Sequence, residues 1–304
     1  MEGKGSTEML WDLIHNNLTR ATYQHWVDEN DDWIKRDDVQ VIFPEMFNDP
    51  RPLSVGMGNP VDRFGPELEF GRIVGDRYDG PTLLIKTAWG GKDVAVDFRP
   101  PSRGTNNYTT WTPGYTSDPE KEPQMPQENY GKYYDLTVNT IQDILSLIER
   151  GEIFEGHTTW ELKGLVWWQG WNDVIHPRKV EEYEANLIAL FRDLRIDLQE
   201  PELPIVVGEM GQLGPNPPAQ NWLRENILTM RRSQRAVTFP NDFHYTSRYV
   251  MTSTYVVENG AHYDGDYHYY GRADTYMQVG RAFGQTMSQL LEDIDHVTAV
   301  EAGR

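Results

Sequence analysis

The chain has 304 residues, of which 38% are hydrophobic and 12% aromatic, a composition too apolar for a disordered protein and sufficient for one large domain or two modest ones. Its 28 Lys and Arg against 47 Asp and Glu give a net charge of −19, which repels nucleic acids and anionic lipid surfaces. The absence of cysteine excludes disulfides, thiolate metal sites and a cysteine nucleophile. We find no apolar run long enough for a membrane span and no signal peptide at MEGKGSTEML, so no membrane partner is expected.

The first third of the chain predicts two helices and two strands. Residues 9–18 and 66–78 have helical patterns, the second opened by proline in its first turn, and residues 39–44 and 81–89 are apolar runs typical of strands. A proline-rich stretch follows at residues 99–131. We expect it to be a loop insertion that runs over the surface without regular structure.

Strands and helices alternate through the rest of the chain. The expected helices span 133–150, 178–198, 219–236 and 273–292; the expected strands span 162–168 and 204–207, with an extended run at 244–257. This order is typical of a parallel sheet with helices on both faces. With no interdomain linker in the sequence, we expect residues 1–304 to form a single α/β domain.

Ligands of such sheets lie beyond the carboxyl ends of the strands, which directs attention to residues 89–92, 169–173 and 208–211. Gly90 and Gly91 indicate either a tight turn that needs positive φ or bare backbone N–H groups suited to an oxyanion. Gln169 is either a structural hydrogen-bonding group or a side-chain oxyanion donor.

Aromatic residues accompany these junctions. Trp89, Trp168 and Trp171 could form a stacking wall for a sugar, although aromatic side chains pack cores more often than they bind sugars. Asn172 and Asp173, which follow Trp171, are further candidates for substrate contact.

A loop near the C-terminus concentrates His262, Asp264, Asp266 and His268. Such a loop could bind a metal, but residues this close in sequence seldom converge on one ion without distant ligands. The preferred hypothesis makes His268 a general base whose tautomer is fixed by a neighbouring carboxylate.

Five blocks in this order resemble the SGNH/GDSL hydrolase superfamily and, within it, the sialate O-acetylesterase-like carbohydrate esterases. The blocks are GPELEFGRIVGD (65–76), LLIKTAWGGKDVAVDFRPPS (83–102), GLVWWQGWND (164–173), VVGEMGQLGPN (206–216) and HYYGRADTYMQVGRAFGQTM (268–287). The resemblance implies a three-layer αβα sandwich with a mostly parallel, flavodoxin-like sheet. It also implies an acylated carbohydrate as substrate and no cofactor or metal.

Carried over by position, the resemblance makes Gly90 or Gly91 an oxyanion N–H donor, Gln169 a side-chain donor and His268 the base. The superfamily usually places the acid three residues before the histidine, where this chain has Gly265. Asp266 and Asp264 flank that position, and we prefer Asp266 over Asp264. His262 is an alternative base.

The resemblance also concerns the nucleophile. In this family a strand ends in Gly-Gln-Ser-Asn, commonly followed by Met-Glu-Gly, and its serine attacks the ester. Because the chain starts at Met1-Glu2-Gly3, we expect that serine and the first strand to lie upstream of Met1. No Gly-x-Ser-x-Gly elbow replaces them, and Ser6 is expected to cap a helix.

Three functions follow as hypotheses. The first is a serine esterase that removes acetyl or similar acyl groups from carbohydrate, with xylan, sialic acid and other acyl sugars as open substrates. The second is a carbohydrate-binding protein that has lost catalysis. The third is a metal-dependent hydrolase that uses the loop from His262 to His268, although the chain lacks cysteine and a His-Glu-x-x-His helix.

Overall fold

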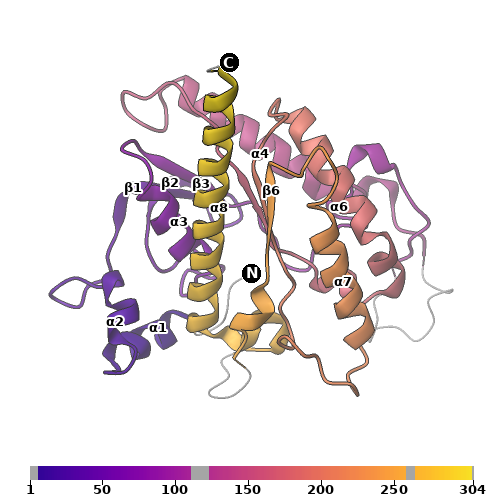
Figure 1. The fold of residues 1–304 in the computed structure, drawn as a ribbon, viewed down its shortest axis with the longest axis horizontal. Helices are drawn as coiled ribbons and strands as arrows, with labels where there is room; N and C mark the ends of the chain where they lie inside the picture. The colour runs from indigo at the N-terminus through magenta and orange to yellow at the C-terminus, as the bar shows by residue number, and fades with distance from the viewer. Residues whose placement is uncertain (1–5, 111–122, 258–263, 303–304) are drawn as a thin grey trace. The chain divides into compact units, whose positions relative to one another are not determined.

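The computed structural model describes residues 6–110, 123–257 and 264–302, whose helices and strands are labelled in Figure 1. The chain divides into two compact units. Unit 1 comprises residues 1–88, 211–216 and 250–304, and unit 2 comprises residues 89–210 and 217–249. Both units mix helices with strands, so the predicted α/β class is confirmed.

Unit 1 contains a three-stranded sheet in the order β2-β1-β3. Strand β1 (Arg36–Phe43) pairs parallel to β3 (Thr82–Ile85) and antiparallel to β2 (Phe47–Leu53). The sequence predicted β1 and β3 but not β2, because Pro50 and Pro52 interrupt its pattern. Those prolines are tolerated because β2 is an edge strand, where a missing N–H breaks no central ladder.

The helices of unit 1 are α1 (Ser6–His15), α2 (Arg20–Tyr23), α3 (Glu67–Gly75) and α8 (Ala273–Ala302), with short 3-10 helices at Gln24–Trp26, Thr252–Tyr255 and Asp266–Gly271. Helices α3 and α8 lie side by side (Figure 1). A Cβ at Gly280 of α8 would lie 2.3 Å from the carbonyl oxygen of Pro66, so only glycine allows this close approach. Helix α8 ends at residue 302 rather than at the predicted residue 292.

Unit 2 contains the second sheet, in the order β4-β5-β6, with β4 (Leu165–Trp167) parallel to β5 (Ile205–Gly208). The extended run expected at 244–257 is wrong in part, because only β6 (Ser247–Val250) is a strand and Thr252–Tyr255 is helical. The hydroxyl of Thr254 donates to the carbonyl of Met251 at 3.1 Å. Such local bonds compete with a strand ladder.

The helices of unit 2 are α4 (Lys132–Glu149), α5 (Trp171–Val174), α6 (Pro177–Asp197) and α7 (Arg224–Ala236). Helix α6 buries an apolar stripe at intervals of three and four residues, formed by Val180, Tyr183, Leu187, Leu190 and Leu194. Helix α7 packs against α6 (Figure 1) and begins at residue 224 rather than 219, after a turn in which Asn221 N–H donates to Pro218.

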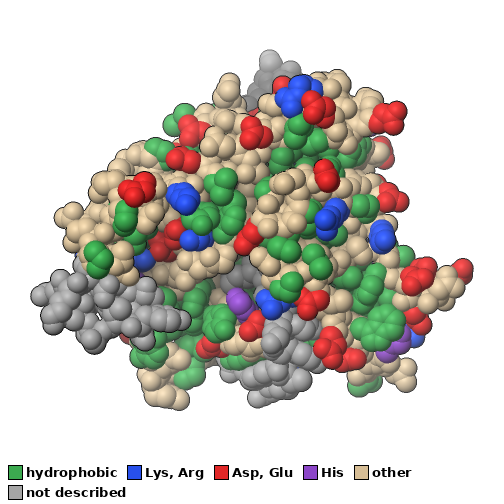
Figure 2. Space-filling view, turned by 180° about the vertical axis from the view of Figure 1, so that it is seen from behind, with side chains coloured by type: hydrophobic (Ala, Val, Ile, Leu, Met, Phe, Trp, Pro, Cys, Tyr) green, Lys and Arg blue, Asp and Glu red, His purple; other side chains and the backbone are tan. Residues whose placement is uncertain are grey.

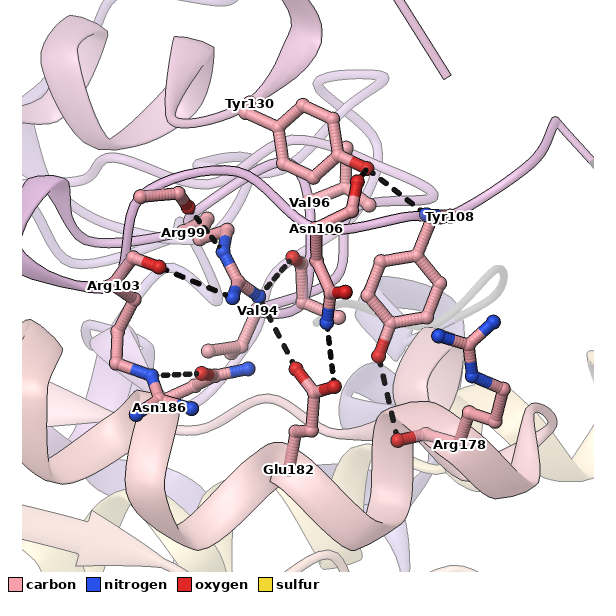
Figure 3. Close-up of polar contacts among 12 residues, drawn as sticks. Val94, Val96, Arg99, Arg103, Asn106, Tyr108, Tyr130, Arg178, Glu182 and Asn186 are labelled. Carbon is pink, nitrogen blue, oxygen red and sulfur yellow. Dashed lines mark hydrogen bonds and ion pairs between the residues drawn. The ribbon is translucent and has the colours of Figure 1, made fainter. Parts of the chain in front are cut away.

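The proline-rich insertion is anchored to α6 (Figure 3). The Arg99 guanidinium, only 4% exposed, donates to Glu182 Oε2 at 3.3 Å and to the carbonyls of Ala95 at 3.0 Å and Gly104 at 2.5 Å. Asn106 Nδ2 donates to the other oxygen of Glu182 at 2.6 Å. One carboxylate on α6 therefore binds two points of the insertion.

The described parts of the insertion also have local structure. Tyr108 is buried, Thr109 and Gln124 form an antiparallel bridge, and 3-10 helices occur at Pro101–Arg103 and Gln127–Asn129. Most residues of 101–110 and 123–129 are exposed, as the surface part of the expectation requires, but the expected absence of regular structure is wrong at the two 3-10 helices and the bridge. The polar side chains of the insertion suggested a loop without regular structure, but several of them bond to α6 rather than to water.

The net negative charge does not gather in one patch on the face shown in Figure 2, where Asp and Glu side chains are spread among Lys and Arg. None of the helices in the described part of the chain combines the length and apolarity needed to cross a membrane.

Candidate active site

One group of candidate residues is a histidine–carboxylate pair in unit 1. His268 Nδ1 lies 2.8 Å from Asp264 Oδ2, with the imidazole partly exposed and the carboxylate largely buried. A carboxylate on Nδ1 places the proton there and leaves Nε2 as the basic nitrogen. This pair can therefore take up and return a proton at Nε2.

The loop that carries His268 is held by a buried tyrosine. Tyr269 is fully buried, and its hydroxyl accepts the N–H of Gly211 and donates to Gln212 Oε1, both at 3.0 Å. Tyr276 donates its hydroxyl to the carbonyl of His268 at 2.7 Å. Tyr269 and Tyr270 have φ of 51° and 58°, a backbone conformation that costs free energy and persists because these contacts impose it.

The contacts of the two aspartates favour Asp264 as the partner of His268, whereas the sequence favoured Asp266. Asp266 Oδ1 accepts the N–H of Tyr267 at 2.8 Å, a local turn contact, whereas Asp264 bonds to the imidazole. Asp264 lies four positions before His268, and the kinked 3-10 turn brings its carboxylate next to the imidazole ring. The spacing in sequence did not reveal this contact. His262, the alternative base, lies outside the described residues.

The described residues contain no cluster of side chains that could hold a metal ion, as the metal hypothesis would require. Among residues 6–110, 123–257 and 264–302, no three His, Cys, Asp or Glu side chains group together as ligands would. Asp264 and His268 bind each other, and Asp266 binds the backbone.

A separate group of candidate residues lies in unit 2, and in sequence it follows the apolar run of β3. Gly90 and Gly91 are exposed, and a Cβ built on either would meet no atom within 4 Å. Gly91 has φ of +73°, which fits the turn interpretation. The same two residues leave backbone uncovered by side chains, as the oxyanion interpretation requires.

Gln169 directly follows Trp168 beyond β4, and its amide is bonded on every side. Its Nε2 donates to Asp173 Oδ2 at 2.7 Å and to the carbonyl of Lys92 at 3.1 Å, and its Oε1 accepts the hydroxyl of Tyr183 at 3.0 Å. Both amide protons therefore have protein acceptors. Gln169 therefore makes the contacts that its structural interpretation expects, and any catalytic role requires that one of these bonds be exchanged.

Asp173 is fully buried, so the structure does not support the expectation that it contacts substrate. It accepts N–H groups of Val94 at 3.0 Å and Ala95 at 3.2 Å besides the Gln169 amide. Burial, with the neighbouring Asp93 carboxylate, raises the pKa of Asp173, while the N–H donors oppose that rise.

The aromatic candidates have mixed surroundings. Trp89 packs edge-on against Tyr133 at 5.2 Å, and Trp168 Nε1 donates to the carbonyl of Glu209 at 2.9 Å. Trp171 begins α5 and is partly exposed. Asn172 Nδ2 lies 3.4 Å from the carbonyl of Lys92. Trp89 and Trp168 thus have packing or hydrogen-bonding roles inside the unit, and each also retains some exposed surface.

Ser6 differs from its expected role as a helix cap. It is fully buried at the start of α1, where its hydroxyl accepts the N–H of Phe64 at 3.0 Å and donates to the same residue's carbonyl at 3.3 Å. A hydroxyl that is buried and bonded in this way is not accessible to an ester substrate.

Comparison with known families adds the deciding observation. Residues 1–289 match the family described as carbohydrate esterase, sialic acid-specific acetylesterase. The chain belongs to this family. Membership confirms the resemblance drawn from the five sequence blocks and makes a carboxylic ester hydrolase of acylated carbohydrate the general function that the family supports.

Solved structures agree on the fold. An Arabidopsis thaliana protein determined by X-ray crystallography is similar to this chain with a TM-score of 0.52 and 18% identity, over 86% of this chain and 88% of that chain. At that identity the likeness concerns the fold alone. No curated protein matches the chain.

Sequence reasoning missed the residues that hold the candidate groups in place. Tyr183 and Lys179 lie on α6 within an ordinary amphipathic pattern, and Lys179 bonds to Asp93, which is 86 positions away. Tyr269 lies in an aromatic run without apolar periodicity. Asp93 and Tyr269 do lie within two of the five family blocks, at residues 83–102 and 268–287, but residue type alone did not show which groups they hold.

Proposed function

We propose that this protein is a carbohydrate O-acyl esterase of the serine type that releases acetyl groups from sugar hydroxyls. The observation that carries the proposal is the bond between His268 Nδ1 and Asp264 Oδ2 in a member of a carbohydrate esterase family. An imidazole held in this tautomer is the general base and acid that acyl transfer needs.

In the proposed mechanism a serine hydroxyl attacks the ester carbonyl carbon while His268 Nε2 takes the hydroxyl proton. The C–O bond to the sugar breaks as the imidazolium returns that proton to the sugar oxygen, which leaves an acetyl-serine. Water then attacks the acyl carbon while His268 takes a proton from the water. The bond between the acyl carbon and the serine oxygen breaks, His268 returns the proton to that oxygen, and acetate and free serine result. Gln169 and the N–H of Gly91 are the proposed oxyanion donors.

The nucleophilic serine can be identified by a labelling experiment. Residues 1–304 contain no Gly-Gln-Ser-Asn block, and Ser6 is enclosed by its bonds to Phe64. Treating the protein with a fluorophosphonate and locating the modified residue by mass spectrometry identifies the nucleophile. A labelled serine whose modification abolishes release of 4-nitrophenol from 4-nitrophenyl acetate supports the proposal. Turnover that persists after complete labelling contradicts it.

The second candidate is a carbohydrate-binding protein without hydrolysis. The engagement of both Gln169 amide protons favours it, because a donor bound to protein acceptors stabilises no oxyanion. Binding of an acetylated oligosaccharide measured by calorimetry, with no acetate released by the same sample, supports this candidate over the esterase.

A further inference from the structure

The two hydrogen bonds from the Gln169 amide differ in length and in the kind of acceptor. One proton is directed at the Asp173 carboxylate, with Nε2 and Oδ2 2.7 Å apart. The other is directed at the neutral carbonyl of Lys92, 3.1 Å away. A shorter N–H···O distance indicates the stronger of two such bonds. The amide is thus held firmly by one proton and less firmly by the other.

The orientation of this amide is fixed by its partners. Rotating it by half a turn would place Oε1 against the Asp173 carboxylate and the Lys92 carbonyl, which are acceptors only. The Tyr183 hydroxyl, which donates to Oε1 at 3.0 Å, selects the same orientation from the other side. Gln169 therefore presents Nε2 in a single direction.

Asp173 is suited to act as an anchor. It is fully buried, and the groups bonded to it are N–H donors: Gln169 Nε2 and the backbone of Val94 and Ala95. A carboxylate can accept all of them, whereas an amide in its place would set its own N–H₂ against donors. The nearby Asp93 is paired with Lys179 Nζ at 2.6 Å, which offsets the repulsion between the two carboxylates.

We propose that Asp173 is a positioning residue that keeps one N–H of the Gln169 amide in a hydrogen bond, so that the N–H now bonded to the Lys92 carbonyl is the one that turns to donate a hydrogen bond to the oxyanion of the substrate. This inference rests on the proposed esterase function. It resolves the conflict between the fully bonded amide and a catalytic role, because only the weaker of the two bonds is exchanged.

The Lys92 carbonyl is the acceptor that is released. It retains a second donor, because Asn172 Nδ2 lies 3.4 Å from the same oxygen and can shorten this contact when Gln169 turns its proton away. The exchange therefore leaves no buried acceptor without a partner, which keeps its cost low. Lys92 directly follows Gly91, so the released carbonyl belongs to the same turn as the other proposed oxyanion donor.

The test is a double-mutant cycle in the full-length natural protein, with 4-nitrophenyl acetate as substrate. Gln169→Ala is expected to lower kcat on the order of 10²–10³-fold, as for the loss of one oxyanion donor. Asp173→Asn is expected to lower kcat at least about tenfold with KM nearly unchanged, and to have no further effect on kcat in the Gln169→Ala background. Asp197→Asn, whose carboxylate accepts the Tyr134 hydroxyl in the same unit, is the matched control with unchanged kcat.

A second variant keeps the test decisive if Asp173→Asn does not fold. Lys179→Met leaves Asp93 unpaired beside Asp173 and is expected to lower kcat only where Gln169 is present. Equal fractional losses in the natural protein and in the Gln169→Ala background, for either variant, overturn the inference and leave the esterase function standing. An unsubstituted protein that releases no 4-nitrophenol overturns the esterase function and the inference with it.

Discussion

The hydroxyl of Tyr269 joins the loop of His268 to residues 211 and 212, because it accepts the N–H of Gly211 and donates to Gln212 Oε1, both at 3.0 Å. Tyr269→Phe removes both bonds inside a buried site. An unpaired buried donor costs about 1–3 kcal/mol, so the free energy of unfolding in urea should fall by that amount. Tyr245→Phe, at a 71% exposed position, should change it by less than about 0.5 kcal/mol. Equal effects of the two substitutions would show that the Tyr269 bonds contribute nothing.

The two aspartates near His268 should differ sharply in their effect on turnover. Asp264→Asn removes the acceptor of the Nδ1 proton and should lower kcat for an acetyl ester on the order of 10⁴-fold, because the imidazole is no longer held in its active tautomer. Asp266→Asn alters only a contact with the Tyr267 N–H and should change kcat by less than a few-fold. The reverse order of effects would restore Asp266 as the acid.

Glu69 should make the stability of the protein depend on pH. Burial raises the pKa of its carboxyl, but hydrogen bonds from His25, Arg72 and Trp26 outweigh burial and bring the pKa down to about 2 from an ordinary value of 4.5. A lowered carboxyl pKa gives stability that is present above pH 4.5 and is lost as the pH falls toward 2. The difference corresponds to about 3 kcal/mol.

Glu69→Gln tests this dependence. The variant should be less stable than the natural protein by up to about 3 kcal/mol at about pH 7, and the deficit should shrink as the pH is lowered toward about 3. Glu292→Gln removes an exposed acid that pairs with Arg77 and should cost about 0.5 kcal/mol or less. A deficit for Glu69→Gln that is the same at both ends of this pH range would contradict the assignment.

The anchor of the insertion predicts a difference between arginine and lysine. Arg99→Lys keeps the charge but lacks the planar fork that serves Glu182 and the carbonyls of Ala95 and Gly104. Its free energy of unfolding should fall by about 2 kcal/mol, since buried carbonyls lose their donors. Arg192→Lys, in an exposed pair with Asp242, should cost less than about 1 kcal/mol. Thermal and urea unfolding of both variants measure the difference.

Strong apolar periodicity made most helices and strands of this protein predictable. Helix α6 and strands β1 and β5 follow their predicted ranges because burial of one face or both faces dictates their residues. Strand β2 was missed because two prolines at a sheet edge cost little and leave no apolar pattern. The insertion was misjudged because polar contacts across 76 to 83 positions, such as Arg99 to Glu182, leave no local signature.

The candidate site was predictable in its chemistry but not in its contacts. Family blocks pointed to His268, Gln169 and the glycine pair from residue identity alone. The partner of His268 depends on a kinked turn with two positive-φ tyrosines, which no propensity favours. The anchoring of Gln169 by Asp173 depends on burial, and a sequence does not show whether a polar residue near a strand end faces solvent or the interior.

The proposed role of the His268–Asp264 pair is to drive hydrolysis of an acyl sugar. The most direct measurement is the rate of acetate release from an O-acetylated oligosaccharide by the full-length natural protein and by its His268→Ala variant, with the fold of both verified by circular dichroism. We predict measurable release by the natural protein and a loss on the order of 10⁴-fold or more in the variant. Release that is unchanged in the folded variant, or absent from the natural protein, would contradict the account.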